Sequence, residues 1–413
     1  MEKYLVINGG SSSLKFSLYQ IEDGKEINIV NGLVERIGID NTNCILKCGD
    51  KKVTHQVEAP NHTVAVEVML DKLKEYNFIE DISEIKGVGH RVLHGGEYYN
   101  DSVIIDDTVL NNIKSLIPFG PLHLPGEISA IESMKEVLPT VPQIAVFDTA
   151  FHQTIPENNY LYAIPRRYYT DYGIRKYGFH GTSHKYITEA MKRILNKEKV
   201  NIIACHVGNG SSECAVKDSK SLNTTMGFTP LDGVIMGTRS GSIDPSILEY
   251  ICDIEGIDVR ECTNILNKKS GLLGISEYSS DIRDIINAQN THPNCAQALK
   301  MLEDSLARVI SQYIIELDGD VDGIVFTAGI GENNPFLREN ILNKFSRTLG
   351  IKVDKSINDN VASFKDIKEA RITTDDSRIH AYVIPTDEES MILKDTVKLS
   401  KEYKNQKKLI KEN

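Results

Sequence analysis

A short pattern that occurs twice limits how this chain can fold. Near the N-terminus, the apolar segment 4–7 (YLVI) is followed by 8–13 (NGGSSS) and then by 14–19 (LKFSLY), where polar and apolar residues alternate. About 200 residues later the same order returns, with 201–206 (NIIACH), 207–212 (VGNGSS) and 213–217 (ECAVK). Each copy predicts two strands joined by a glycine- and serine-rich turn, which is a hairpin. The repetition indicates two related halves.

The composition is that of a globular protein. Hydrophobic residues make up 40% of the 413 positions and charged residues 25%, which excludes a disordered chain. This length predicts roughly two or three domains. The net charge of −11 argues against a general nucleic-acid-binding protein, because such proteins need a cationic face for phosphates. A small anionic substrate is still compatible, since local arginines can build a positive site.

Cysteine usage and the lack of targeting signals predict a cytoplasmic protein. The seven cysteines are odd in number, scattered and without a CxxC pair, which fits free thiols better than disulfides or a zinc site. The apolar stretch before Asn8 is too short for the core of a signal peptide. No apolar run approaches about 18 residues, so we expect no membrane-spanning helix.

Further elements follow from periodicity and from helix-capping residues. Apolar spacing predicts helices over 64–76 and 299–317, and strands over 143–147, 323–328 and 381–384. We expect a domain boundary near residue 150 and a third glycine loop over 329–335 (GIGENNP). Pro335 would start a helix that Asn334 caps. Thr386 would cap a last helix, whose lysine-rich end we interpret as a solvated face.

Three glycine-containing segments are candidates for binding phosphate: 8–13, 206–212 and 329–333. Glycine allows backbone N–H groups to approach an anion, and serine adds hydroxyl donors. Lys15 could reach a phosphate oxygen. The chain contains neither GxxxxGK[ST] nor GxGxxG, which excludes a P-loop nucleoside triphosphatase and leaves a dinucleotide-binding fold unsupported.

The densest cluster of polar side chains is 89–96 (GHRVLHGG). Arg91 beside a glycine turn suits an anion clamp, since its planar fork can grip a carboxylate or a phosphate. A plain surface arginine is the alternative. Metal ligation by His90 and His94 is disfavoured, because Gly95 and Gly96 argue against a helix that would align the two rings.

Other segments add candidates for a site. In 179–184 (FHGTSH), His180 could donate to a developing phosphoryl charge or could be a satisfied structural histidine. Arg239 lies between glycines in 236–241 (MGTRSG), a loop that we expect to be flexible. Asp148 follows a strand end, where α/β sites usually lie. No GxSxG is present, so a serine hydrolase lacks its signature.

Segments 8–15 and 89–96 resemble the two signature patterns of the acetate kinase family. The resemblance continues through 179–184, 206–210, 238–241, 329–333 and 385–389. It implies an α/β fold of the actin, Hsp70 and sugar-kinase superfamily, with two ribonuclease-H-like domains and an active-site cleft between them. The implied domains are 1–150 plus 386–413, and 151–385, the second one binding nucleotide.

The resemblance also implies roles for individual residues. Asp148, His180, Arg239 and Arg91 would be catalytic, and Asn8 and Glu388 would hold or orient Mg²⁺ (Mn²⁺ as a substitute). The substrate would meet Arg91 and an apolar pocket with His123 nearby; the pocket residues are Leu93, Leu122, Phe179 and Pro230. ATP would meet a larger set: Lys15, His206, Val207, Gly208, Asn209, Gly210, Asp281, Ile282, Arg283, Gly329, Ile330, Gly331, Glu332 and Asn333.

The implied reaction is the reversible transfer of the γ-phosphoryl group of ATP to acetate, which gives acetyl phosphate and ADP. A homodimer is expected from the family. Two departures from the family pattern are Asp387, where asparagine is usual, and Leu93, where valine is common. The larger Leu93 would mildly favour acetate over longer acids, since one methylene is worth about 1–3 kcal/mol.

Rival functions are propionate or butyrate kinase, a chaperone-like or filament-forming ATPase of the same superfamily, and a sugar kinase. A chaperone-like ATPase would not need the Arg91 and Arg239 clamps. A sugar kinase would need a base to deprotonate a hydroxyl, for which Asp148 could serve. A carboxylate with a pKa of about 4–5 is already ionised and needs only relief of anion repulsion. We therefore expect Asp148 to orient an arginine or a metal-bound water.

Overall fold

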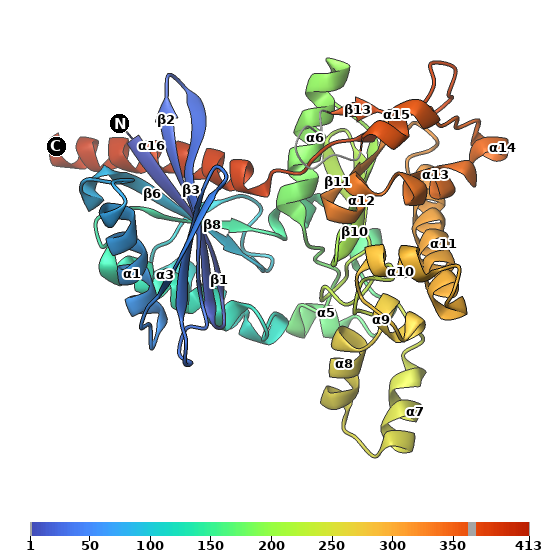
Figure 1. Cartoon of the computed structure of the whole chain (residues 1–413), viewed down its shortest axis with the longest axis horizontal. Coiled ribbons are helices and arrows are strands. Elements are labelled where there is room, and N and C mark those ends of the chain that lie inside the picture. Colours follow the sequence, from blue (N-terminus) through green and yellow to red (C-terminus); the bar gives the residue numbers. More distant parts are fainter. Residues whose placement is uncertain (1, 362–368, 413) are drawn as a thin grey trace. The chain divides into compact units, whose positions relative to one another are not determined.

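The computed structural model describes residues 2–361 and 369–412, and the chain forms two compact units. The first contains the chain up to Ala150 and from Asp387 onward, and the second is Phe151–Thr386. Each unit has its own β-sheet with helices on both faces (Figure 1).

The sheet of the first unit begins with the predicted hairpin. β1 pairs antiparallel with β2 from end to end, and Asn8 lies opposite Lys15. The strands therefore run further than expected, and only Ser11 and Ser12 form the turn. The strand order is β5-β4-β3-β2-β1-β6-β8-β7. The bounds are β1 Glu2–Gly10, β2 Ser13–Glu22, β3 Lys25–Glu35, β4 Asn43–Cys48, β5 Lys51–Gln56, β6 Ile85–Val92, β7 Val103–Ile104 and β8 Gln143–Phe147.

Alternating side chains of β1 build two cores, one on each face of this sheet. Leu5 and Ile7 pack in a cluster that α1 (His62–Glu75) and α3 (Leu124–Val137) cover. Tyr4 and Val6 point to the other face, which α16 (Glu388–Glu412) covers. A period of two in the strand therefore produces a three-layered unit.

The sheet of the second unit repeats the arrangement of the first. Its order is β11-β10-β9-β12-β14-β13, so an antiparallel β9–β10–β11 meander is followed by parallel β12 and β14. The first sheet has β1–β2–β3 followed by parallel β6 and β8. The predicted duplication is confirmed. The bounds are β9 Ile202–Val207, β10 Ser211–Lys217, β11 Lys220–Thr224, β12 Gly323–Thr327, β13 Ala370–Arg371 and β14 Ala381–Val383.

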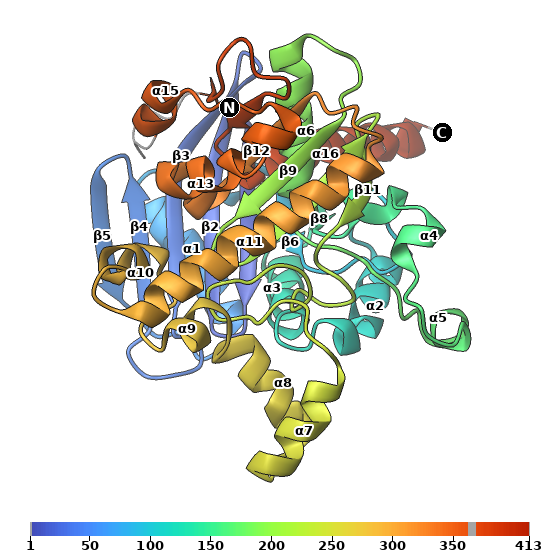
Figure 2. The same ribbon diagram turned by 90° about the vertical axis from the view of Figure 1, so that its right-hand side faces the viewer.

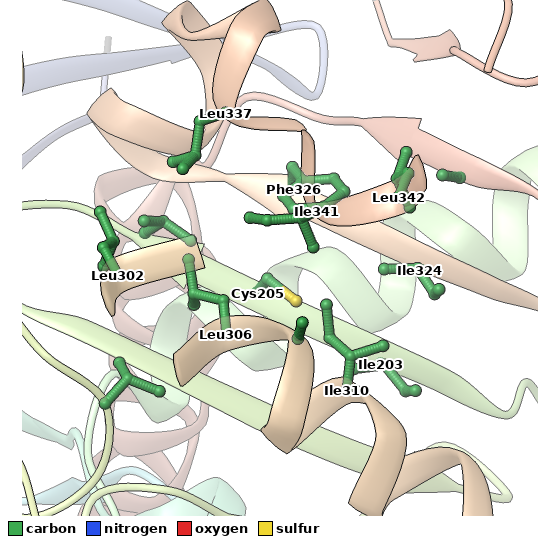
Figure 3. Close-up of a cluster of buried hydrophobic side chains, with 14 of the residues drawn as sticks. Ile203, Cys205, Leu302, Leu306, Ile310, Ile324, Phe326, Leu337, Ile341 and Leu342 are labelled. Carbon is green, nitrogen blue, oxygen red and sulfur yellow. The ribbon is translucent and has the colours of Figure 1, made fainter. Parts of the chain in front are cut away.

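The helices α11 (Pro293–Glu316) and α6 (Gly181–Leu195) lie on opposite faces of the second sheet. α11 runs across one face (Figure 2), where Leu302, Leu306 and Ile310 meet Ile203 and Phe326 of the strands (Figure 3). α6 covers the opposite face. Because both faces are covered, β9 and β12 are buried throughout and mostly apolar, with His206 and Thr327 as polar residues near their carboxyl ends.

Shorter helices complete the two units. The first unit adds α2 (Asp107–Ser115), η1 (Ile82–Glu84) and η2 (Ile117–Phe119). η3 (Ala150–Thr154) begins at the unit boundary. The described residues of the second unit add further short helices: α4 Glu157–Tyr160, α5 Arg167–Tyr172, α7 Ser246–Glu255, α8 Val259–Lys268, α9 Gly271–Ser276, α10 Ile282–Ala288, α12 Ala328–Asn333, α13 Pro335–Asn343, α14 Ser346–Leu349 and α15 Lys355–Asn360.

Two local predictions were wrong. The third glycine loop is mostly the helix α12, which follows directly on β12. Thr386 does not cap the last helix: Asp387 does, since its Oδ1 accepts from the Ser390 N–H at 2.9 Å. The Thr386 hydroxyl instead contacts the Ser183 hydroxyl at 2.8 Å. The prediction for Asn334 is confirmed, because its side chain accepts from the Leu337 N–H.

Within the described ranges, no helix is both long enough and apolar enough to cross a bilayer. All seven cysteines lie in these ranges and are free thiols.

Candidate functional site

Arg91 and Asp148 form the central ion pair of the first unit. They come from β6 and from the end of β8, which are parallel neighbours. Arg91 Nε donates to Asp148 Oδ1 at 3.0 Å and Nη2 donates to Oδ2 at 2.7 Å. The Asp148 side chain is 1% exposed and that of Arg91 is 27% exposed. The Asp148 carboxylate raises the pKa of the Arg91 guanidinium, so the arginine is a fixed cation.

Two further carboxyl groups lie near Arg91. Glu388, the first residue of α16, has its Oε2 3.8 Å from Arg91 Nη2. Burial raises the pKa of Glu388, while the Arg91 charge acts in the opposite direction. Glu127 of α3 accepts from the Leu93 N–H at 2.9 Å, and burial raises its pKa to about 8. Neither the spacing nor a motif in the sequence marked Glu127.

Lys15 and Glu389 form a second ion pair in this unit. Lys15 Nζ lies 2.7 Å from Glu389 Oε1, and Glu389 Oε2 accepts from the Ser17 and Tyr19 hydroxyls. The lysine predicted to meet a phosphate is therefore held by a carboxylate of α16. The Lys15 side chain nevertheless remains half exposed.

The first glycine segment serves packing. A Cβ on Gly9 would lie 2.6 Å from the Ala130 Cβ, and one on Gly126 would lie 2.4 Å from the Gly10 carbonyl carbon. The glycines of 8–13 and Gly126 therefore allow α3 to approach the hairpin closely, and phosphate binding by this segment stays a prediction.

The two histidines beside Arg91 have structural partners. His90 Nε2 lies 2.7 Å from Gln143 Oε1, and burial lowers the pKa of His90 to about 4. His94 Nδ1 accepts from the Gly96 N–H at 2.9 Å, and burial lowers its pKa to about 3. Both rings are buried, and their lowered pKa values keep them neutral.

In the second unit, a group of histidines surrounds the start of α6. His180 is the N-cap residue of α6 and has a left-handed backbone (φ 56°), which is uncommon outside glycine. Its Nδ1 lies 2.9 Å from the Ser212 Oγ. Its ring stacks on that of His206 with centroids 4.1 Å apart. Ser212 Oγ also lies 2.8 Å from His184 Nε2.

Arg239 lies against the same turn as His180. A Cβ built on Gly210 would be 3.3 Å from Arg239 Nη1 and 3.6 Å from His180 Cε1. Arg239 Nη1 donates to the Pro230 carbonyl at 3.2 Å. Burial lowers the pKa of Arg239, and no carboxylate within the described ranges pairs with it. Its positive charge is therefore uncompensated, in contrast to that of Arg91.

The segment that carries Arg239 is tightly packed, so the expected flexible loop was wrong. A Cβ on Gly237 would lie 2.0 Å from Asn209 Oδ1, and one on Gly271 would lie 2.2 Å from the Met236 carbonyl oxygen. The Gly237 N–H also donates to the Asn209 carbonyl at 3.1 Å. Arg239 is thus held by backbone contacts on both sides.

The remaining candidates of this unit fall in two places. Glu332 of α12 accepts from the Thr386 N–H at 3.1 Å, and α12 adjoins the Gly208 turn, since a Cβ on Gly208 would be 3.7 Å from the Ala328 Cβ. Asp281 caps α10 and pairs with Arg283, Nη2 to Oδ2 at 2.5 Å, at the surface.

The predicted site residues divide between the units. The first unit holds Asn8, Lys15, Arg91, Leu93, Leu122, His123, Asp148 and Glu388, and the second holds the others. Of the predicted pocket, Leu93 and Phe179 are buried, whereas Leu122 is 63% exposed. Sequence reasoning assigned no individual role to Glu127, Glu389, Ser212 or His184, although the last three lie in the segments 385–389, 206–212 and 179–184. His184 could have been found, because it follows His180 by one helical turn.

The described residues contain no group of three or more His, Cys, Asp or Glu side chains placed to bind a metal ion. Asn8 and Glu388 nevertheless offer an amide and a carboxylate oxygen, the donors that Mg²⁺ takes alongside water and substrate phosphates. The donor chemistry therefore fits a magnesium ion that arrives with a nucleotide.

Comparisons with known proteins agree over nearly the whole chain. The model of the acetokinase family matches residues 3–394. The acetate kinase of Bacillus subtilis is 47% identical over 404 residues, which cover 97% of this chain and 100% of that one. The acetate kinase of Thermoanaerobacterium thermosaccharolyticum is 50% identical over 408 residues, with coverage of 97% and 100%.

Solved structures also match over nearly the whole chain. The crystal structure of Porphyromonas gingivalis acetate kinase has a TM-score of 0.90 at 38% identity, and a propionate kinase from Francisella tularensis has 0.88 at 41%. Both cover 97% of this chain and 100% of their own. A family match of this extent, on a duplicated α/β fold with the signature segments in place, leads to one conclusion: the chain belongs to the acetokinase family.

Proposed function

We propose that the protein is an acetate kinase, which reversibly transfers the γ-phosphoryl group of ATP to acetate and gives acetyl phosphate and ADP. The observation that carries this proposal is the end-to-end similarity to acetate kinases, at 47–50% identity. The chemistry of the candidate residues supports it, because the reaction brings acetate and the γ-phosphate together. These two anions repel each other unless positive charge in the site stabilises them.

Arg91 and Arg239 would supply this charge in different ways. The Nε and Nη2 atoms of Arg91 are engaged by Asp148, so Nη1 would be directed to an anion in a fixed orientation. Arg239 has no carboxylate partner in the described part of the chain and would bring a full charge to the transferring phosphoryl group. His180 would add an N–H donor to an equatorial oxygen.

Asp148 would position Arg91 and would carry no proton. Both of its oxygens accept from Arg91, and acetate with a pKa of about 4–5 is ionised without a base. Attack by a carboxylate oxygen on the γ-phosphorus needs no proton transfer, so the chain contributes orientation and neutralisation.

Mg²⁺ would be held by Asn8 and Glu388 together with the nucleotide phosphates. When bound, the ion supplies neutralisation of the phosphate oxygens. The candidate ATP residues would act as follows: Lys15 would exchange Glu389 for a phosphate oxygen, and the Gly208–Gly210 turn and α12 would line the nucleotide together with Asp281, Ile282 and Arg283.

The acceptor would be a short carboxylic acid. Leu93 and Phe179 are buried apolar side chains suited to a methyl group, and Leu122 and Pro230 would complete the pocket with His123 nearby. Propionate is the second candidate, because a propionate kinase is 41% identical. Hydroxylamine trapping of the acyl phosphate formed from ATP and acetate, propionate or butyrate tests the proposal. Comparable kcat/KM values for acetate and propionate would show that the enzyme accepts a broader range of acids than proposed. If none of the three acids gave an acyl hydroxamate, the proposed function would be refuted.

We also propose a homodimer in which α7 contributes to the contact. α7 (Ser246–Glu255) has no buried residue, and its Ile247, Tyr250 and Ile254 are exposed at helical spacing. In Figures 1 and 2, α7 and α8 project from the rest of the second unit. An exposed apolar patch of this kind marks an interaction site, and a second copy can cover it symmetrically.

A cytoplasmic location is part of the same proposal. Seven free thiols suit a reducing compartment. Cell fractionation with an activity assay for acetyl phosphate formation would test it.

A further inference from the structure

A serine hydroxyl lies between two imidazole rings next to the candidate phosphoryl site. Ser212 Oγ is 2.9 Å from His180 Nδ1 and 2.8 Å from His184 Nε2. The two histidines are one helical turn apart at the start of α6, where the backbone N–H of His184 donates to the backbone carbonyl of His180 at 3.0 Å. Ser212 comes from β10, just after the Gly208–Gly210 turn. Ser212 and His184 are fully buried.

The buried ring of His184 can carry its proton in only one favourable place. Burial, followed by the nearby rings of His152 and His206, holds the pKa of His184 well below its ordinary value, so the ring is neutral. A neutral imidazole has one N–H. His184 Nδ1 meets no hydrogen-bond partner in the described part of the chain, so an N–H there would be buried and unsatisfied. The proton therefore belongs on Nε2, which donates to Ser212.

The direction of the second hydrogen bond follows from the first. Ser212 has one hydroxyl hydrogen, and His184 already donates to its oxygen. The rings of His180 and His184 are the two hydrogen-bond partners of Ser212 Oγ among the described residues. The Ser212 hydroxyl hydrogen can therefore form a hydrogen bond only with His180 Nδ1. His180 Nδ1 is then an acceptor, and the proton of a neutral His180 is on Nε2.

The neighbouring Arg239 disfavours a positive charge on His180. The guanidinium of Arg239, which has no carboxylate partner in the described part of the chain, and the Cε1 atom of His180 both lie close to Gly210. The ring of His206 stacks on the other side at 4.1 Å, and its Nδ1 contacts the Ser183 Oγ at 2.8 Å. A second positive charge beside Arg239 would be repelled.

We propose that Ser212 and His184 are positioning residues that hold His180 as the neutral Nε2–H tautomer. The inference rests on the proposed function for the role of His180 as a donor to the phosphoryl group. In this arrangement the arginines bring the charge and His180 brings one directed N–H. Second partners of this kind fix the tautomer of functional histidines in general.

The direct test is long-range ¹H–¹⁵N NMR on protein with ¹⁵N-labelled histidine, at neutral pH and without substrates. The His180 signals are assigned by their loss in His180→Gln. The expected result is a protonated Nε2 and an unprotonated Nδ1 for both His180 and His184. An Nδ1–H tautomer or an imidazolium at His180 would overturn the proposal. This readout does not depend on activity, so failure of the proposed reaction would be a separate result.

Variants separate positioning from a general loss of structure. In Ser212→Ala and His184→Leu we expect kcat to fall roughly 10- to 100-fold, with KM for ATP and acetate within about twofold, because the N–H is misdirected but binding is kept. His184→Gln places an amide N–H near the position of Nε2 and should recover most of kcat. An equal loss of kcat in His184→Gln and His184→Leu would contradict the proposed positioning of His180. An unchanged His180 tautomer in folded Ser212→Ala would contradict it as well.

Discussion

The Arg91 guanidinium grips both oxygens of Asp148, at 3.0 Å and 2.7 Å, from the neighbouring strand of the same sheet. The carboxylate is buried, whereas the arginine is partly exposed. Such a two-point contact fixes the plane of the guanidinium as well as its position. Asp148 therefore holds the guanidinium rigidly through Nε and Nη2, which leaves Nη1 as the donor that can face an anion.

Loss of this cation should remove most of the activity. We expect Arg91→Ala to lower kcat by about 10³ or more, the scale that one arginine contributes to phosphoryl transfer, and Arg239→Ala to do the same. Arg91→Lys should recover little, because an ammonium cannot make the bidentate contact. Steady-state acetyl phosphate formation measures this, and near-normal turnover of either alanine variant would remove that arginine from the mechanism.

Buried Glu213 should make stability fall as pH rises. Burial raises its pKa to about 8, and one carboxyl oxygen has no partner among the described residues. The folded state holds this proton above about pH 4.3, where the unfolded chain releases it. The free energy of unfolding should therefore decrease between about pH 4.5 and 8, by up to about 1.4 kcal/mol per pH unit from this group.

Glu213→Gln isolates this contribution. The amide cannot ionise, so the variant should gain stability relative to the parent across that window and level off above pH 8. Glu198→Gln, at an exposed position, is the matched control and should track the parent. Urea unfolding at several pH values measures both, and parallel curves for Glu213→Gln and the parent would show that the group is not protonated in the fold.

Gly237 should be intolerant of a methyl group. An added Cβ would lie 2.0 Å from Asn209 Oδ1, which must move with the turn that carries Gly210. We expect Gly237→Ala to raise KM for ATP and lower kcat, with a combined loss of about 10²-fold in kcat/KM. Gly329→Ala adds its methyl to open space, so its melting temperature should match the parent. An unchanged KM for ATP and an unchanged kcat in Gly237→Ala would show that the turn that carries Asn209 and Gly210 does not contribute to nucleotide binding.

Asp387 should matter as a helix cap. Its carboxylate accepts from the Ser390 N–H at the start of α16. Asp387→Asn keeps an acceptor, so the free energy of unfolding and the Mg²⁺ dependence of kcat should stay close to those of the parent. Asp387→Ala should cost about 1 kcal/mol. A strong change in Mg²⁺ dependence for Asp387→Asn would instead place this carboxylate at the metal.

The exposed face of α7 should control association. Tyr250→Arg combined with Ile254→Asp puts charges on that face, and charged groups are unfavourable in the core of an interface. Sedimentation velocity should show a dimer for the parent and a monomer for the variant, with an unchanged circular dichroism spectrum. Lys300→Glu, on the exposed surface of α11, is the control. A dimer that survives both changes would locate the contact elsewhere.

Some elements could be predicted because their signals are local. The hairpins of β1–β2 and β9–β10 follow from alternation and turn residues, and the cap at Asn334 follows from one side chain and the proline after it. The prediction of a loop over 329–335 failed because most of its residues lie in α12, which follows β12 directly. The prediction for Thr386 failed because the neighbouring Asp387 is also a capping residue, and its carboxylate is the one that accepts from the Ser390 N–H.

The sequence by itself determined the duplicated α/β architecture and marked Arg91, Asp148, His180 and Arg239 as chemically special. Apolar periodicity and residue type are carried by each segment alone, so no distant contact is needed to interpret them. Tertiary structure decided the pairings: Arg91 with Asp148, Lys15 with Glu389, and Ser212 between His180 and His184. These partners are remote in the chain, and hydrogen bonds depend on ångström-scale distances and on burial that only the packed fold provides.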